Sequence, residues 1–270
     1  MRALATEAFA RVRQNRACGH CVGTANLSIN ALRCDAKNGK TILKIAVIPA
    51  RGGSKRIPRK NIKSFAGKPI IAWPIEAALK VFDDVIVSTD DEEIAQIVRA
   101  LGANVPFMRT AELANDHAAT IPVIAHGIDA YEQTTGSKVD IACCIYATAA
   151  FVTADMLNDA MSKLKDDINY VMPIAEFPAP IQRAIRVDGD RLGMFNPEKY
   201  YFRSQDLERA FYDPGQFYVG RADAWRRGEI MYSKNAIGIE VSSDSVEDID
   251  TLQDWLRAEE KFLRKWPNRT

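Results

Sequence analysis

Three short apolar runs alternate with segments of helical spacing along this chain of 270 residues. The runs are KIAVIPA (44–50), DVIVSTD (84–90) and VDIACCIYA (139–147), and the segments after or between them are 70–80, 91–102 and 120–133. Continuous apolar runs are typical of strands buried on both faces of a parallel sheet. Because parallel strands need crossover connections, the alternation predicts right-handed βαβ units and a doubly wound, mostly parallel sheet in a three-layer α/β/α domain.

The rest of the chain continues this alternation and interrupts it once. The spacing predicts helices over 156–167 and 246–266 and strands over 169–175, 216–222 and 236–241. Residues 176–215 are irregular and rich in Pro and aromatic side chains, which indicates an insertion that serves as a lid or a subunit contact. Pro74 lies inside the helical segment 70–80, so we expect that helix to begin near Trp73.

Charge and hydropathy exclude two classes of partner. The 36 Lys and Arg residues balance 35 Asp and Glu residues, so the chain has no overall attraction for nucleic acid or for an anionic membrane. No apolar run reaches the roughly 18 to 20 residues that span a bilayer, and the N-terminus lacks the apolar core of a secretory signal. We therefore expect a soluble, cytoplasmic protein whose anion recognition is local.

Residues 1–43 differ from the rest: they have no strong period, and they hold three of the five cysteines. Their CGHC sequence, Cys18 to Cys21, resembles a thiol–disulfide motif, but about 40 residues cannot supply the thioredoxin-like unit that this chemistry needs. A zinc site that adds His20 and Cys34 is a weak alternative. We interpret 1–43 as an N-terminal extension, disordered or the result of a misassigned start, and 44–270 as the folded domain.

The stretch IPARGGSKRIPRKN, residues 48–61, follows the first predicted strand. Chain that leaves a parallel strand reaches the carboxyl edge of the sheet, where open α/β folds bind ligands. Gly52 and Gly53 let backbone N–H groups approach an anion, and the surrounding Lys and Arg supply charge that a polyphosphate neutralises. The spacing matches neither a Walker A loop nor the G-x-G-x-x-G dinucleotide motif. The stretch predicts a different phosphate-binding loop, and the alternative is a solvated basic turn.

These residues carry a resemblance to a known family. IPARGGSKRIPRKN is similar to the N-terminal signature of the CMP-sialic acid synthetase (acylneuraminate cytidylyltransferase) family, and VIVSTDDEEIA, ACCIYATA, PIQRA, RSQDLE and GQFY follow in the order of its pseudaminic acid branch. The resemblance implies a Rossmann-like nucleotidyltransferase domain over 44–270. It also implies transfer of CMP from CTP to the anomeric hydroxyl of a nonulosonic acid, first of all pseudaminic acid, with release of pyrophosphate.

The resemblance assigns roles within the basic loop. It implies that the phosphates and ribose of CTP are held by Arg51, Gly52, Gly53, Ser54, Lys55, Lys60 and Asn61. Lys60 is the first candidate for the α-phosphate and Arg51 for the β and γ end, whereas Arg56 and Arg59 equally suit exposed positions. Because the transfer needs in-line positioning and neutralised phosphoryl charge, the predicted catalytic residues are Arg51, Lys55, Lys60 and Asp250.

A D-x-D sequence near the C-terminus suggests a metal site. Asp248 and Asp250 in VEDIDT point to one side of an extended segment, and such a pair beside phosphates binds Mg²⁺. The family has a matching D-x-D, which supports a Mg²⁺ cofactor. The alternative is that these acids precede a helix that starts near Thr251.

Contacts with cytosine and ribose are implied for Ser88, Thr89 and Asp90, where the second predicted strand ends. Asp90 suits the N-cap of the helix over 91–102 equally well. A sugar acid carries a carboxylate, which calls for Arg and hydrogen-bond donors. The resemblance implies that its pocket includes Tyr146, Thr148, Arg183, Arg203, Gln205, Gln216 and Tyr218, each of which also suits a packing or surface position.

Family members pair as dimers, so we expect a homodimer through 176–215 in which one subunit helps to close the other's sugar pocket. Tyr146 stands where sialic acid enzymes carry Gln and favours the pseudaminic branch. The chain departs from that branch at Ala150, where Pro is usual, and near Tyr212 and Val219, where His and Trp are expected. The alternatives are a CMP-N-acetylneuraminic or CMP-legionaminic acid synthetase, or a non-catalytic CTP-binding homologue.

Overall fold

The computed structural model describes residues 41–114 and 119–269. Strand β1 (Lys44–Pro49) opens the sheet, and the Leu43 N–H just before it donates to Asp140 at 3.0 Å. Residues 1–40 of the predicted extension, with the CGHC motif, lie outside the described residues. Within those residues, no helix combines the length and the apolar character that crossing a membrane requires.

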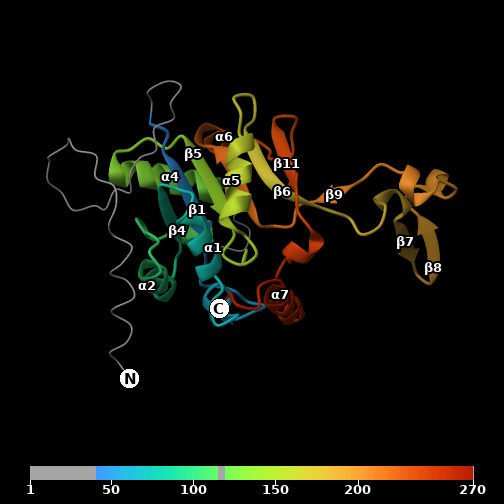
Figure 1. Ribbon diagram of the computed structural model, residues 1–270, viewed down its shortest axis with the longest axis horizontal. Coiled ribbons are helices and arrows are strands. Elements are labelled where there is room, and N and C mark those ends of the chain that lie inside the picture. Colours follow the sequence, from blue (N-terminus) through green and yellow to red (C-terminus); the bar gives the residue numbers. More distant parts are fainter. Residues whose placement is uncertain (1–40, 115–118, 270) are drawn as a thin grey trace. The chain divides into compact units, whose positions relative to one another are not determined.

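A seven-stranded sheet forms the centre of the domain (Figure 1). Its strands in order are β11 (Ala236–Glu240), β6 (Tyr170–Glu176), β10 (Phe217–Arg221), β5 (Ile141–Ile145), β1 and β4 (Asp84–Ser88), with β9 (Phe211–Tyr212) paired to β6. β10 is antiparallel to β5 and β6, and β9 is antiparallel to β6, whereas the other pairs are parallel. The remaining strands therefore share one direction, which confirms the predicted mostly parallel sheet.

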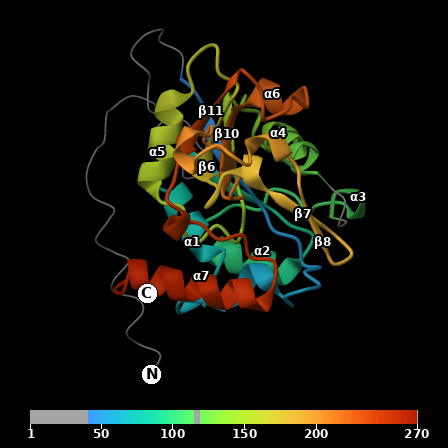
Figure 2. The same cartoon turned by 90° about the vertical axis from the view of Figure 1, so that its right-hand side faces the viewer.

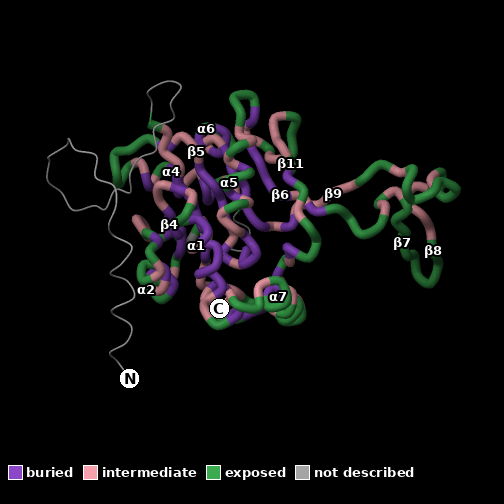
Figure 3. The backbone as a smooth tube through the Cα atoms, viewed as in Figure 1, coloured by how far each residue is buried: buried purple, intermediate pink, exposed green. Residues whose placement is uncertain are grey.

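Helices cover both faces of the sheet. One face carries α1 (Ala72–Ala78), α2 (Glu92–Ala100) and α5 (Ala154–Lys163), and the other carries α4 (Thr120–Thr135) and α6 (Ala222–Arg226). Ile75 and Leu157 join the apolar cluster on the first face, and Ile128 and Trp225 join the cluster on the second. Figure 2 shows α5 and α4 on opposite sides of the strands, and Figure 3 shows the buried strands between them. The three-layer prediction is confirmed.

The C-terminal helix α7 (Leu252–Lys265) packs on a third apolar cluster. Its Phe262 contacts the rings of Phe65, in the short hairpin of β2 (Ser64–Phe65) and β3 (Lys68–Pro69), and of Trp73. Trp73 lies in α1, which begins at Ala72, so Pro74 falls in the first turn as predicted. The packing of α7 brings the D-x-D segment beside the basic loop, which is remote in sequence.

Residues 177–210, called the arm from here on, leave the sheet after β6 and return at β9. The prediction of irregular structure was wrong in part, because β7 (Ile185–Asp188) and β8 (Arg191–Met194) form an antiparallel hairpin. The arm also contains the short turns η2 (Ile181–Arg183), η3 (Pro197–Lys199) and η4 (Ser204–Asp206). Each hairpin strand has four residues, too few for an alternating pattern to stand out. Figures 1 and 3 show the hairpin set apart from the sheet and largely exposed.

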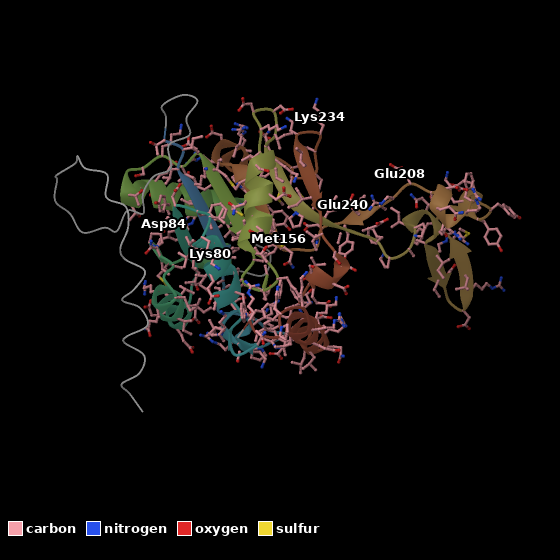
Figure 4. The ribbon with its side chains drawn as sticks, in the orientation of Figure 1. Lys80, Asp84, Met156, Glu208, Lys234 and Glu240 are labelled. Atoms are coloured by element: carbon pink, nitrogen blue, oxygen red, sulfur yellow. The ribbon has the colours of Figure 1, made fainter. Side chains whose placement is uncertain are left out.

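Ion pairs fix the base of the arm. Arg209 binds Glu176 at the end of β6 and Glu240 at the end of β11, each at 2.8 Å. Figure 4 labels Glu240 on the sheet and Glu208, the neighbour of Arg209, on the arm. The arm therefore leaves the sheet from a defined root.

Gly220 on β10 provides a test of the packing between β10 and α6. A Cβ at this position would lie 2.7 Å from a Tyr170 ring carbon and 2.6 Å from Trp225 Nε1. We predict that Gly220→Ala lowers the free energy of unfolding by about 1–3 kcal/mol, because the rings or the strand must shift. Urea denaturation measures this change. Gly53→Ala, whose Cβ meets nothing within 4 Å, is the control, and equal losses in both variants would contradict the described packing.

Candidate functional site

A cavity of about 280 Å³ opens at the carboxyl ends of β1 and β5. Its walls are the loop after β1, the loop after β5 and the first turns of α4. The predicted residues that line it are Arg51, Ser54, Lys55, Lys60, Asn61, Tyr146 and Thr148. The cavity thus lies at the sheet edge where open α/β folds bind ligands, and it brings together side chains from distant parts of the sequence.

Acidic side chains at the start of α2 hold the basic loop. Arg59 bonds both carboxylate oxygens of Asp91, with 3.0 Å to Oδ1, and it also bonds Glu93. The bond from Arg59 holds the pKa of Asp91 below its usual range. These contacts also offset the cost of the left-handed backbone of Arg59, whose φ is 55°. Arg59 is therefore an anchor of the loop rather than a solvated side chain.

Asp91 also determines where glycine is needed. Its side chain accepts the Ile94 N–H at 3.0 Å, so Asp91 caps α2, and the alternative of Asp90 as the N-cap is wrong. Asp90 instead accepts the Gly52 N–H at 2.9 Å. A Cβ on Gly52 would lie 2.5 Å from Asp91 Oδ2, whereas one on Gly53 would meet nothing within 4 Å. The loop thus requires Gly52 for its close approach to α2 and leaves Gly53 approachable by a ligand.

The C-terminal segment supplies the remaining partners of the loop. Lys60 Nζ donates to the Ile249 carbonyl at 2.6 Å and lies 3.8 Å from Asp250 Oδ1. Arg56 Nη2 donates to the same Asp250 oxygen at 2.9 Å. Burial lowers the pKa of Lys60, and the charge of Asp250 opposes that shift. The basic cluster, which has no acid nearby in sequence, is balanced by acids from two remote segments.

Asp248 and Asp250 have the donor chemistry of a Mg²⁺ site. Burial, and then the charge of Asp250, raise the pKa of Asp248. Among the described residues, no group of three or more His, Cys, Asp or Glu side chains could hold a metal. Mg²⁺ in nucleotide enzymes commonly uses one or two carboxylates with substrate phosphates and water, so the pair fits this ion.

Arg109 is a cavity residue that the sequence analysis missed. Its side chain is 8% exposed and donates to the carbonyls of Ser88 and Leu113, but its buried Nε has no hydrogen-bond partner. Burial lowers its pKa, and the neighbouring charges of Asp90 and Arg51 act in opposite directions. No spacing rule singles out one Arg in a connection between helices. Thr120 and Val123 of α4 also line the cavity and were missed for the same reason.

The predicted contacts to cytosine and ribose, Ser88, Thr89 and Asp90, do not line the cavity. Ser88 and Thr89 are fully buried and do not line it, and Thr89 Oγ1 accepts the Asp91 N–H. The main chain of Ser88 supports the site, because its carbonyl accepts from the Ala50 N–H and from Arg109. Their contact with a nucleotide therefore stays a prediction.

The predicted sugar-acid residues divide into two groups. Tyr146 and Thr148 line the cavity, and the buried Gln216 and Tyr218 support Tyr146, whose N–H donates to the Gln216 carbonyl at 3.0 Å. Tyr218 packs on the Tyr146 ring with centroids 5.8 Å apart. The second group, Arg183, Arg203 and Gln205, is exposed on the arm and does not line the cavity. Arg203 pairs there with Asp206, and Arg183 donates to Ser204.

The departures from the family pattern do not line the cavity. Ala150 and Val219 are fully buried in apolar clusters. Tyr212 lies on β9, with its ring 5.2 Å from that of Phe177 at the root of the arm. These side chains therefore affect packing, and none of them removes a group from the cavity wall.

Comparison with known proteins places this site in a family. A model of the family described as Cytidylyltransferase matches residues 45–254. This chain belongs to the cytidylyltransferase family. A pseudaminic acid cytidylyltransferase of Campylobacter jejuni is 40% identical over 214 residues, which cover 78% of this chain and 92% of that one. The family resemblance carried by the sequence motifs is confirmed.

Other cytidylyltransferases are more distant. An N-acylneuraminate cytidylyltransferase B of Danio rerio is 33% identical, and the match covers 81% of this chain and 51% of that protein. A CMP-N,N'-diacetyllegionaminic acid synthase of Legionella pneumophila is 32% identical, and the match covers 80% of this chain and 94% of that protein. Among solved structures, a CMP:2-keto-3-deoxy-manno-octonic acid synthetase complexed with CTP has a TM-score of 0.60 at 19% identity, covering 83% of this chain and 99% of that one. This likeness confirms the α/β nucleotidyltransferase fold.

The raised pKa of Asp248 generates a stability prediction. The folded protein protonates Asp248 more readily than the unfolded chain does, so this group lowers stability as pH rises through its folded-state pKa. We predict that Asp248→Asn raises the Tm at pH 7, and that the gain shrinks as pH falls toward about 4, where unfolded Asp also protonates. Calorimetry measures both values. Asp190→Asn, at an exposed turn, is the control, and a lower Tm of Asp248→Asn at pH 7 would contradict the assignment.

Proposed function

We propose that this chain transfers CMP from CTP to the anomeric hydroxyl of a nonulosonic acid, releases pyrophosphate and so supplies an activated sugar for surface glycans. The observation that carries the proposal is a cationic loop that lines the cavity and whose Arg56 and Lys60 lie against Asp250 of the D-x-D segment, in a chain of the cytidylyltransferase family. Relatives named for pseudaminic acid support that sugar first. Relatives named for acylneuraminic and legionaminic acids support these sugars as the second candidates.

The loop after β1 receives the triphosphate in this proposal. Lys60 lies at the α-phosphate, because it already sits beside Asp250, and Arg51 and Lys55 neutralise the β and γ end. Gly53 leaves the backbone open to the phosphate oxygens, whereas the Gly52 N–H is bonded to Asp90 and holds the loop against α2. Arg109 lines the same cavity and supplies a further cation for the nucleotide.

The reaction forms one bond and breaks one bond. The anomeric oxygen attacks the α-phosphorus, the bond from that phosphorus to the bridging oxygen of pyrophosphate breaks, and the hydroxyl proton is released. Charge grows on the phosphoryl oxygens during this step, so prearranged cations stabilise the transition state more than the ground state. Lys60 and Arg51 act in this way, and the loop anchors at Asp91 and Ile249 keep them in position.

Asp248 and Asp250 would hold Mg²⁺. When bound, the ion neutralises phosphate charge and fixes the in-line geometry. Asp250 accepts from Arg56 in the free protein, and we expect Arg56 to exchange this partner for a phosphate oxygen when the nucleotide is bound. The sugar acid enters beside Tyr146 and Thr148, on the β5 side of the cavity.

A second copy of this chain completes the sugar pocket in our proposal. The arm exposes large apolar side chains on its hairpin: Leu192 is 73% exposed and Val187 is 68% exposed. Arg183 and Arg203 lie on the same arm and do not line their own cavity, and a carboxylate substrate needs such cations. A homodimer that pairs the arms buries the apolar residues and brings the arginines to the partner's sugar acid. We assign the reaction to the cytoplasm, which the two free, buried thiols of Cys143 and Cys144 support.

Pyrophosphate release tests the reaction. With CTP, Mg²⁺ and pseudaminic acid, we predict turnover that stops when the metal is chelated and falls at least about 100-fold in Asp250→Ala, because charge neutralisation is lost. Asp244→Ala, an exposed acid six residues away, is the matched control. Turnover with N-acetylneuraminic acid alone would select the second candidate. CTP binding without release from any nonulosonic acid would contradict the proposed enzyme and favour the non-catalytic homologue.

Mixing two inactive variants tests the shared site. In the proposed dimer, each site takes its basic loop from one subunit and its arm from the other. Lys60→Ala removes a loop cation and Arg183→Ala removes an arm cation, so both sites are damaged in a dimer of either variant alone. Random pairing of the two variants restores about a quarter of the intact sites. We predict that activity returns on mixing after mild dissociation, as measured by pyrophosphate release.

Light scattering provides the control for this experiment. Leu192→Asp is expected to shift the protein from dimer to monomer, whereas Ile230→Asp, a comparably exposed apolar residue outside the arm at 70% exposure, leaves the dimer intact. A monomeric parent protein, or no recovery of activity in the mixture, would contradict the shared site.

A further inference from the structure

We infer that Asp213 is a positioning residue for the sugar-acid side of the cavity, and that it holds Tyr146 in place through Gly215 and Tyr218. The inference rests on the proposed function, because it takes Tyr146 as a wall of the sugar-acid pocket. Asp213 lies just before β10 and does not line the cavity. Asp213 is not among the residues assigned to phosphate, metal or sugar binding.

Three donors converge on the Asp213 carboxylate. Its Oδ2 accepts from the hydroxyls of Tyr218 and Tyr232, each at 2.6 Å, and its Oδ1 accepts from the Gly215 N–H at 2.8 Å. Within the described part of the chain, no ion pair includes Asp213. Hydrogen bonds to an ionised acceptor are shorter and stronger than neutral ones, so this carboxylate fixes the direction of all three donors.

Two of the groups that Asp213 holds touch the Tyr146 ring. Tyr218 packs on it edge to face, with centroids 5.8 Å apart. Gly215, at a φ of 62°, lies against the same ring, since a Cβ there would be 3.9 Å from two of its carbons. The next residue, Gln216, accepts the Tyr146 N–H through its carbonyl at 3.0 Å. The Asp213 carboxylate therefore fixes the Tyr218 ring and the loop at Gly215, and both contact Tyr146.

The Tyr146 hydroxyl joins two walls of the cavity. It lies 2.7 Å from Thr120 Oγ1 at the start of α4, and both residues line the cavity. Burial raises the pKa of Tyr146 to about 12, so its hydroxyl is neutral at pH 7. A small displacement of the ring breaks this contact and changes the width of the cavity between α4 and β5. A specific fit to the sugar acid thus depends on how firmly Asp213 holds its donors.

The nucleotide side of the cavity is held by different contacts. Arg59 anchors the loop on Asp91, and Lys60 is fixed by the Ile249 carbonyl. Neither contact includes Asp213 or its donors. A loosened Asp213 network is therefore expected to weaken sugar-acid binding while CTP binding remains, which a general loss of folding would not do.

Tyr232 allows the separate effect on sugar-acid binding to be tested with a residue that does not line the cavity. Its side chain is 66% exposed in the connection between α6 and β11, and it does not line the cavity. It reaches the site through its hydrogen bond to Asp213. Tyr232→Phe removes that one donor, and Asp213→Asn removes the charge that orients all three.

The experiment compares steady-state kinetics with CTP affinity. We expect Tyr232→Phe to raise KM for the sugar acid by about 5- to 10-fold and Asp213→Asn to raise it further, with kcat and the Kd for CTP and Mg²⁺ changed by less than about twofold. The double variant should add little to Asp213→Asn, because both changes act through one carboxylate. Tyr170→Phe is the matched control, since that buried hydroxyl has no hydrogen-bond partner. An unchanged KM in both variants, or parallel losses of kcat, CTP affinity and Tm, would overturn the inference.

Hydrogen exchange keeps this test separate from the proposed function. The Tyr146 N–H is bonded to Gln216 without any substrate, so exchange in peptides over 145–149 should accelerate in Asp213→Asn while peptides over β1 stay unchanged. A parent protein that releases no pyrophosphate would defeat the proposed function, and exchange over 145–149 would still decide the positioning role. Unchanged exchange there would overturn the inference even in an active enzyme.

Discussion

The mutual repulsion of the cations in residues 51–60 is the constraint on which the rest of this structure depends. A loop with five Lys and Arg side chains and no acid of its own would spread into solvent if nothing opposed its charge. Asp91 opposes it at one end, where a single carboxylate both caps α2 and binds Arg59. Asp250 opposes it at the other end, where it binds Arg56. The cations are thus held close together at the cavity, in the arrangement that a polyphosphate requires.

This balance explains why the C-terminal helix is part of the site. α7 packs through Trp255 and Phe262 onto the hairpin that follows the loop, and its Thr251 cap fixes the chain just after Asp250. Apolar burial of one face of the helix therefore determines the position of the carboxylates in the segment just before it. Such an arrangement couples folding to function, because the packing of α7 positions the segment that carries the proposed metal ligands.

Local sequence patterns predicted most of the fold and the part of the site that directly follows β1. β1, β4 and β5 follow from continuous apolar runs, and Lys60 and Asn61 follow from the resemblance of the basic loop to the family signature. Arg109, Thr120 and Asp213 could not be predicted, because their roles come from tertiary contacts that no spacing encodes. The role of Arg59 was left open for the same reason, since its partner is 32 residues away. The arm hairpin was missed because its short exposed strands have no core to impose a pattern.

Diffraction from crystals grown with CTP, and with Mn²⁺ in place of Mg²⁺ for its anomalous signal, tests whether the basic loop and the D-x-D segment form one nucleotide site. We predict a triphosphate along residues 51–61, with the α-phosphate at Lys60 Nζ and a metal peak between it and the carboxylates of Asp248 and Asp250. We also predict that Arg59 remains on Asp91 while Arg56 leaves Asp250. A triphosphate bound away from this loop, or a metal held by neither aspartate, would show that the two segments do not form such a site.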